Sequence, residues 1–321
     1  MHGLCGLVSS DWKNGYHFKL MSDYDADRPR PWLLRRLLVL AAAVGFLVIC
    51  YGWIRRPALP FVGDSLSTNT GQFESRVRSS LRVASFNIRA GRGIDGDTDL
   101  IRTANLLGSF DVIGLNEVRG KLYGSPGNQA EELARILQLP WAFAPGERRF
   151  WHDSFGNALF SRVPISHYSV SPLPHRQWGG YRSVLHAKVR LDGAVVNLLI
   201  THVDRSDQDR ATQFRAAAEL FLSLAEPAIL MGDLNTAGDD LLMQNLLQIA
   251  GVQDPIGDTT TLPAKERIDW ILTRGLQTLE AGAVSSAVSD HPLVWAHLVL
   301  PPTGIERPTT QSTTRPTSPG D

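Results

Sequence analysis

The sequence is poor in cysteine and has no excess of positive charge, and both shortages exclude classes of protein. Its 321 residues include two cysteines, Cys5 and Cys50, which are too few for a disulfide framework or a cysteine-based zinc site. Segment 81–300 carries 20 Lys and Arg against 24 Asp and Glu, so it lacks the basic stripe typical of a high-affinity DNA-binding protein. With 43% hydrophobic and 20% charged residues, the chain has an ordinary globular composition.

One long hydrophobic run lies near the N-terminus. Residues 37–54 form an uncharged stretch of 18 residues, which as a helix would be about 27 Å long, close to the roughly 30 Å hydrocarbon core of a bilayer. Trp32 and Trp53 flank the run as interfacial aromatics do. A buried core helix and a cleaved signal peptide are the alternatives. Paired arginines at both ends argue against the first, and the lack of an A-x-A-like site argues against the second. The run predicts a transmembrane anchor that contacts the lipid bilayer.

The charges around this run predict its orientation and a division of the chain. Four arginines precede the run within ten residues, whereas two follow it closely. The positive-inside rule then makes residues 1–36 a cytoplasmic tail and places the rest of this single-pass membrane protein on the extracytoplasmic side. Residues 55–80 contain Pro, Gly, Ser and Thr and predict a linker, and the Pro/Thr/Ser-rich segment 301–321 predicts a disordered tail. We therefore expect the chemistry to lie within 81–300.

Segment 81–300 alternates strand and helix patterns. Strands are expected at 81–88, 111–116, 157–160, 183–190, 195–201, 228–231, 268–272 and 293–299. Helices are expected at 100–107, 129–137, 207–224 and 240–249, with Ser206 as the N-cap of the third. Many strands with few helices indicate two packed sheets flanked by helices.

A glycine motif after the first of these strands matches a dinucleotide-binding fingerprint. Gly91, Gly93 and Gly96 fit G-x-G-x-x-G, and Glu117 follows about twenty residues later. In that fingerprint the glycines directly follow the strand and open a helix, whereas here other residues intervene and three aspartates crowd the presumed phosphate site. The motif is better explained as a loop.

Six short motifs place polar residues at or beside strand ends. They are Ser85-Phe86-Asn87, Asn116-Glu117, Thr201-His202, Gly232-Asp233-Leu234-Asn235, Arg267-Ile268-Asp269-Trp270 and Ser289-Asp290-His291. Most have a structural explanation when taken singly, such as a turn-capping Asn, a buried His or an Asx turn. Asp269 is harder to explain in this way, because Asp is disfavoured in strands and costly to bury unpaired.

Together these motifs resemble the endonuclease/exonuclease/phosphatase superfamily, which has the deoxyribonuclease-I-like fold. GDLN, IDW and SDHPLV follow one another at the spacing of that family, and the resemblance extends from Arg82 to His297. It includes GNALFSR at 156–162 and the pair Arg210 and Gln213, and it has Asn116 where the family usually has Gln. The resemblance implies an α/β fold, namely a four-layer α/β/β/α sandwich of two packed mixed β-sheets flanked by helices, here preceded by a single transmembrane helix.

The resemblance also implies a metal-dependent hydrolase of phosphoester bonds, with Mg²⁺ as cofactor and Mn²⁺ as a substitute. The expected metal ligands are Asn87, Glu117 and Asp290. The expected catalytic residues are His202 as general acid, Asp233 to orient or deprotonate water, Asn235 as a donor to the phosphoryl group, and His291 with Asp269 fixing its tautomer. Arg182 and Asn157 are the expected contacts to the substrate phosphate. Whether His291 or Asp233 is the general base stays open.

The fold leaves the substrate open. The slightly acidic catalytic segment and the predicted anchor favour a phosphodiester or phosphomonoester at a membrane, such as a lipid headgroup or a small phosphoester, and a nuclease acting on DNA or RNA is the alternative. Arg148-Arg149-Phe150-Trp151 either touches headgroups or forms an ordinary loop. A catalytically inactive membrane-anchored binding module is disfavoured, because Glu117, Asp233 and His291 are all present. No protein partner is predicted.

Overall fold

The computed structural model describes residues 31–63, 78–121, 127–149, 152–176, 179–257 and 262–302. Its contacts divide into two compact units, residues 1–50 and 51–321. Helix α1 spans Pro31–Trp53, and its stretch Trp32–Trp53 is long and apolar enough to cross a membrane by length and composition. The expected cytoplasmic tail, except its last six residues, and nearly all of the expected C-terminal tail lie outside the described residues.

The second unit is built on two mixed sheets. The seven-stranded sheet has the order β1 (Arg56–Pro57), β5 (Trp141–Arg149), β6 (His152–Ser161), β4 (Val112–Arg119), β3 (Ser80–Asn87), β13 (Leu293–Val299) and β12 (Gln277–Val284). The six-stranded sheet has the order β11 (Asp269–Arg274), β10 (Ala228–Asp233), β9 (Ala194–Thr201), β8 (Ser183–Leu191), β7 (His167–Pro172) and β2 (Phe61–Gly63). The pairs β3–β4 and β9–β10 are parallel, and the other neighbouring pairs are antiparallel.

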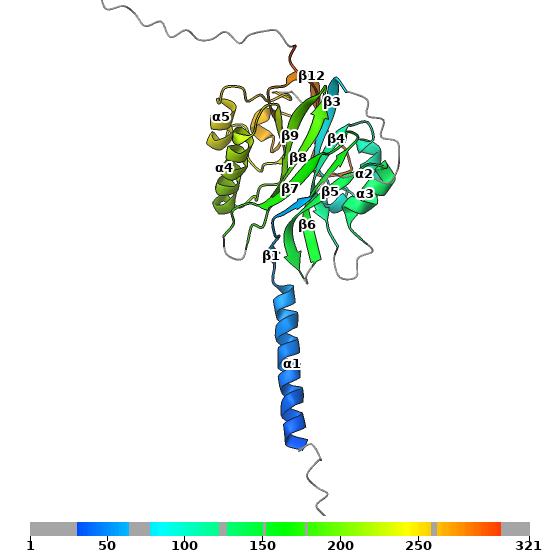
Figure 1. Ribbon diagram of the computed structural model, residues 1–321, viewed down its shortest axis with the longest axis vertical. Helices are drawn as coiled ribbons and strands as arrows, with labels where there is room; N and C mark the ends of the chain where they lie inside the picture. Colours follow the sequence, from blue (N-terminus) through cyan, green and yellow to red (C-terminus); the bar gives the residue numbers. More distant parts are fainter. Residues whose placement is uncertain are drawn as a thin grey trace, which may run out of the picture. The chain divides into compact units, whose positions relative to one another are not determined.

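Helices cover the outer face of each sheet (Figure 1). Helices α2 (Leu100–Leu107) and α3 (Gln129–Leu137) pack on the seven-stranded sheet, and α4 (Asp207–Ser223) and α5 (Leu241–Leu247) pack on the six-stranded sheet. Two short 3₁₀ helices, Arg89–Gly91 and Ala264–Glu266, lie in connections. A third apolar cluster, which includes Leu81, Leu185 and Met231, fills the space between the sheets. The predicted four-layer α/β/β/α sandwich is therefore confirmed.

Because side chains alternate along a strand, the polar residues at the strand ends face the space between the two sheets, at one edge of the sandwich. Leu81 and Val83 of β3 lie in the cluster between the sheets, and Asn87 continues the same face of the strand two positions after Ser85. On β10, Met231 lies in that cluster and Asp233 follows it two residues later on the same face. The apolar rows between the sheets thus end in polar residues at the carboxyl ends of these strands.

Several elements differ from the sequence expectations. Five strands were not expected: β1, β2, β5, β7 and β12. The first two lie in the expected linker 55–80 and extend one edge of each sheet, so the beginning of that segment is part of the sandwich. Residues 64–77 lie outside the described residues. Ser206 is at the N-cap position of α4 but makes no side-chain capping hydrogen bond there. The glycine motif lies in the connection between β3 and α2. Asp99 is the N-cap of α2, so the helix begins after the motif and the glycines do not open it.

Candidate active site

Asn87 lies at the end of β3 and links the two sheets. Its Nδ2 donates to Glu117 Oε1 at 3.2 Å and to Asp233 Oδ2 at 3.0 Å, and its Oδ1 accepts from the backbone N–H of Arg89 at 3.0 Å. Asn87 is fully buried. Glu117 belongs to one sheet and Asp233 to the other. The Asn87 amide therefore hydrogen-bonds to a carboxylate of each sheet and joins the two at one site.

Glu117 reaches the site because β4 contains a bulge. The pairing of β4 with β6 shifts register between Leu115 and Val118, and Glu117 has a φ of 57°. On a regular strand Glu117 would face α2 and α3 together with Leu115. The bulge turns Glu117 toward Asn87 and returns Val118 to the apolar cluster beneath the helices. A positive φ at a non-glycine residue is costly and is typical of functional sites.

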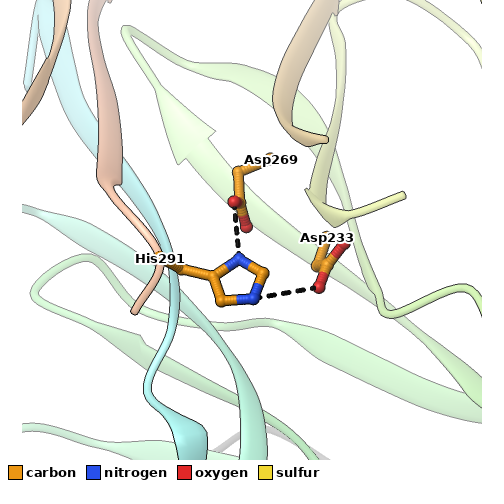
Figure 2. Close-up of side chains that lie close together, drawn as sticks. All are labelled: Asp233, Asp269 and His291. Carbon is orange, nitrogen blue, oxygen red and sulfur yellow. Dashed lines mark hydrogen bonds and ion pairs between the residues drawn. The ribbon is translucent and has the colours of Figure 1, made fainter. Parts of the chain in front are cut away.

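His291 lies next to both Asp269 and Asp233, and each of its ring nitrogens faces one of these carboxylates (Figure 2). His291 Nδ1 lies 2.8 Å from Asp269 Oδ2, and His291 Nε2 lies 3.9 Å from Asp233 Oδ2. Burial alone would lower the pKa of His291, but the hydrogen bond to Asp269 and the charges of both carboxylates outweigh it and raise the pKa to about 9. At neutral pH, His291 is therefore a cation held by Asp269.

Asp233 lies at the centre of the site and has an unusual proton affinity. It pairs in register with Asp269 across the β10–β11 ladder. Burial and the nearby charge of Asp269 raise the pKa of Asp233 to about 7. A carboxyl group that changes protonation state near neutral pH is suited to accept a proton during catalysis.

His202 also lies next to Asp233, but its environment contrasts with that of His291. His202 Nε2 is 3.4 Å from Asp233 Oδ2 and 3.3 Å from Asn235 Nδ2, and Nδ1 is 3.5 Å from Arg182 Nη1. Burial, and then the positive charge of Arg182, lower the pKa of His202 well below its ordinary value. The ring is therefore neutral at pH 7. Because a guanidinium can only donate, Nδ1 accepts from Arg182 and the ring proton is on Nε2.

Asp290, the third expected metal ligand, lies beside Asn87. Ser289 Oγ donates to the carbonyl oxygen of Asn87 at 2.7 Å and lies 3.3 Å from Asp290 Oδ1. Asp290 Oδ2 is 3.3 Å from Arg89 Nη1, and its side chain is 46% exposed. Of the three expected metal ligands, Asn87 and Glu117 are in contact, whereas Asp290 is paired with Arg89 and follows the serine that contacts the Asn87 backbone.

Two sets of side chains could hold a metal ion. Asp233, Asp269 and His291 offer ligand atoms that lie within 4.8 Å of one another. A histidine ligand must be neutral, so a cation bound to this set would have to displace the proton that Asp269 and Asp233 favour on His291. Asn87, Glu117 and Asp290 offer oxygen ligands alone, which suits a hard divalent cation.

The two expected phosphate contacts differ in their placement. Arg182 is 18% exposed, and its Nη2 lies 3.4 Å from Asp204 Oδ2. Asn157 is buried; its Oδ1 accepts from Asn116 at 2.8 Å, and its Nδ2 donates to the carbonyl oxygen of Ser183 at 3.0 Å. Asn157 therefore belongs to the frame of the site, whereas Arg182 keeps partial exposure to solvent.

Three residues that the sequence reasoning did not assign also build the site. Asn116 Oδ1 accepts from the backbone N–H of Asp233 at 2.8 Å, and so fixes the end of β10 from the opposite sheet. Gly232 has a φ of 143°, and a Cβ there would lie 1.8 Å from the carbonyl oxygen of Thr201. Asp204 holds Arg182, and Gln213 accepts from its backbone N–H at 2.8 Å. The sequence signals of this frame were Asn116 in the Asn116-Glu117 motif, the glycine before Asp233 and the Arg210-x-x-Gln213 motif.

Comparison with protein families identifies this arrangement. The model of the endonuclease/exonuclease/phosphatase family matches residues 84–291, which extend from β3 to His291. The chain belongs to the endonuclease/exonuclease/phosphatase family. Members of this family are phosphoesterases and nucleases that use divalent metals, which supports a hydrolase acting on phosphoester bonds.

Solved structures of this family share the fold. An endonuclease/exonuclease/phosphatase from Beutenbergia cavernae is 25% identical and aligns over 70% of this chain and 72% of its own, with a TM-score of 0.58. One from Bacteroides vulgatus is 17% identical over 70% of this chain and 100% of its own, also with a TM-score of 0.58. D. rerio TDP2 complexed with single strand DNA product is 19% identical over 68% of this chain and 99% of its own, with a TM-score of 0.51. A comparison with curated proteins gave no match.

Proposed function

We propose that this chain is a Mg²⁺-dependent phosphoesterase anchored in a membrane by α1, and that it hydrolyses phosphodiester or phosphomonoester bonds. The observation that carries the proposal is the set of proton affinities around Asp233, which has a pKa of about 7 beside a cationic His291 and a neutral His202. Such a divergence of pKa values within one site is characteristic of acid–base catalysis. The arginines around α1 favour an extracytoplasmic catalytic domain.

Asn87, Glu117 and Asp290 would hold the cation, with Mn²⁺ as a substitute for Mg²⁺. When bound there, the cation supplies positive charge that neutralises the phosphoryl group. For Asn87 to contribute Oδ1, its amide must turn over, because Nδ2 now faces Glu117. For Asp290 to contribute, it must exchange its ion pair with Arg89.

The residues around Asp233 divide the proton transfers between them. His291 is protonated at neutral pH and cannot accept a proton, so Asp233 is the general base that receives the proton of the attacking water. His291 then donates from Nε2 to a phosphoryl oxygen, with Asp269 holding its ring. As the new P–O bond forms and the bond to the leaving oxygen breaks, that oxygen takes a proton from His202, whose neutral ring must first take up a second proton from solvent. The charge of a bound phosphate would raise its pKa for this role.

Asn235 and Arg182 complete the proposed phosphate site. Asn235 Nδ2 donates to the carbonyl oxygen of Val203 at 2.8 Å, which leaves its second hydrogen for a phosphoryl oxygen. Asn235 has a φ of 45°, a conformation whose cost is consistent with a functional position. Arg182 supplies a positive charge next to His202.

The test is metal-dependent hydrolysis of bis(p-nitrophenyl) phosphate by the full chain in lipid nanodiscs. We expect Glu117→Gln to lower the rate at least about 10³-fold, because loss of a metal-holding carboxylate removes transition-state charge stabilisation. Glu280→Gln, an exposed carboxylate on β12, is the matched control and should leave the rate unchanged. Equal rates for Glu117→Gln and the wild-type chain would contradict the proposal, and a folded chain inactive on every phosphoester would favour a binding module.

A nuclease is the second candidate, because one relative was solved with a single strand DNA product. Incubation with supercoiled plasmid and Mg²⁺ tests it. Nicking that EDTA and Glu117→Gln both abolish would establish a nuclease. No nicking by a chain that still hydrolyses the small phosphodiester would exclude nonspecific nuclease activity.

A further inference from the structure

The strand that follows α1 fixes the side from which the chain enters the sandwich. β1 begins at Arg56, three residues after Trp53, the last residue of α1. Three residues span at most about 11 Å. The Arg56 guanidinium lies 4.3 Å from the centre of the Tyr51 ring, in the last turn of α1. β1 therefore starts next to the end of the helix.

Strand direction relates this entry point to the catalytic residues. β1 is antiparallel to β5, β5 to β6, and β6 to β4, so β1 runs opposite to β4. The carboxyl end of β4 carries Glu117, and β1 therefore begins at the edge of the sheet where β4 ends. In the other sheet β2 is antiparallel to β7, β7 to β8, and β8 to β9, so β2 also runs opposite to the strand that leads to His202.

The register shows how near the entry point is to the site. Pro57 pairs with Glu147, Glu147 with Phe155, and Phe155 with Arg119, which is two residues beyond Glu117. Three strand spacings separate β1 from β4, or about 14 Å. β1 therefore begins beside the edge of the sheet at which β4 ends and Glu117 lies. We call this edge the catalytic edge.

The corner where β1 meets β5 carries positive charge. Arg55, Arg56, Arg148 and Arg149 lie in or next to these two strands. Arg55 and Arg149 pair with Glu147, at 3.1 and 3.5 Å, and Arg148 pairs with Asp153 at 3.0 Å. Four arginines against these two carboxylates favour contact with an anionic lipid surface. Phe150 and Trp151, the other half of the basic–aromatic motif, lie outside the described residues.

We propose that the catalytic edge faces the bilayer in which α1 is anchored, and that the substrate is a phosphoester in the headgroup of a lipid of that same membrane. This inference rests on the proposed function and on α1 crossing the membrane. A headgroup phosphate would lie at the level where β1 begins. A nucleic acid would instead have to enter between the catalytic edge and an anionic surface that repels its phosphates.

The orientation is tested by labelling two edges of the full chain in anionic vesicles. In a Cys5→Ser, Cys50→Ser background, a bimane fluorophore is attached at Arg119→Cys on the catalytic edge or at Gln277→Cys. β12 is parallel to β3 through β13, so Gln277 lies at the edge where β3 begins. We expect lipids with a spin-labelled headgroup to quench the label at 119 several-fold more than the label at 277. Equal or stronger quenching at 277 would overturn the proposal.

The substrate is tested by freeing the catalytic edge from the membrane. Forty Gly/Ser residues inserted between Ile54 and Arg55 lengthen the connection between α1 and β1 by about 35 Å. The start of β1 is then no longer held close to the end of α1. The same insertion between Pro301 and Pro302 is the control. With a fluorescent headgroup phosphodiester in the same vesicle, we expect the first insertion to slow lipid hydrolysis several-fold and the second to leave it unchanged. Hydrolysis of bis(p-nitrophenyl) phosphate should remain within about twofold for both.

The outcomes separate this inference from the proposed function. Hydrolysis of the soluble phosphodiester without hydrolysis of any headgroup phosphoester would overturn the lipid substrate and leave the phosphoesterase intact. Plasmid nicking faster than headgroup hydrolysis would likewise overturn it in favour of a nucleic acid. Loss of all hydrolysis by the wild-type chain would instead contradict the proposed function.

Discussion

The two histidines that flank Asp233 have opposite surroundings, although each lies within hydrogen-bonding or ion-pairing range of the same carboxylate. His291 is held by the buried Asp269, and its pKa is raised to about 9. His202 is buried against Arg182, and its pKa is lowered well below the ordinary value. One ring is therefore a cation and the other is neutral at the same pH. The comparison shows that the surroundings of each ring, Asp269 next to His291 and the buried position of His202 against Arg182, set the protonation state of that histidine and so its role.

Removing the partner of His291 should have the largest effect on this contrast. Asp269→Asn replaces a carboxylate acceptor by an amide, so the pKa of His291 should fall and its tautomer should no longer be fixed. We expect kcat/KM for bis(p-nitrophenyl) phosphate to fall about 10³- to 10⁴-fold. Asp239→Asn, an exposed carboxylate after the GDLN motif, should not change it. A loss of less than tenfold would show that Asp269 does not set the state of His291.

Removing the neutral ring should have a smaller effect. His202→Gln keeps a donor near Asp233 but cannot carry a proton to the leaving oxygen, so we expect kcat to fall about 10²-fold. The loss should shrink for a substrate whose leaving group needs no proton, such as p-nitrophenolate, relative to an alkyl alcohol. An equal loss for both leaving groups would contradict the role of His202 as general acid.

The pH dependence of the rate sharpens the comparison further. Asp233 must be ionised to accept a proton, so kcat/KM should rise with pH through about 7. His291 must be protonated to donate, so kcat/KM should fall as pH rises through about 9. For bis(p-nitrophenyl) phosphate, whose leaving group needs no proton from His202, the expected profile is a bell with its maximum near pH 8, measured at saturating Mg²⁺. A rate that declines steadily from pH 6 upward would be inconsistent with Asp233 as the base.

The smallest expected effect comes from the partner of His202. Arg182→Met removes the positive charge that lowers the pKa of His202, so that pKa should rise while burial still holds it below the ordinary value. We expect a loss of about tenfold or less in kcat/KM, partly from weaker phosphate binding. Arg182→Lys should recover part of it. An unchanged chemical shift of the His202 ring in Arg182→Met would show that the two side chains do not interact.

Much of the fold could be predicted from the sequence because its elements carry strong local signals. The expected helices 100–107 and 129–137 agree with α2 and α3 residue for residue, since Asp99 and Asn128 cap them through side-chain hydrogen bonds. β5 was missed because Pro145 and Gly146 interrupt it and its register shifts there. β12 was missed because most of its residues are exposed or half-buried, so its pattern lacks the alternation of a half-buried strand.

Part of the site could be predicted from the sequence for a similar reason. Asn87, Asp233 and Asp269 continue rows of inward-facing apolar residues, and a polar side chain at the end of such a row is visible in a sequence. The contacts that hold these side chains in place could not be predicted. The backbone N–H of Asp233 bonds to Asn116, and Arg182 pairs with Asp204, and both contacts join residues far apart in the chain. The protonation states of the two histidines depend on burial and charge in three dimensions, which sequence spacing does not give.

The most direct test is an NMR titration of the histidine rings in the full chain in nanodiscs, with His202→Gln and His291→Gln used to assign the signals. The account predicts that His291 titrates near pH 9 and that His202 stays neutral, with its proton on Nε2, to well below pH 6.5. Two rings that both titrate near pH 6.5, or the reverse assignment, would contradict it.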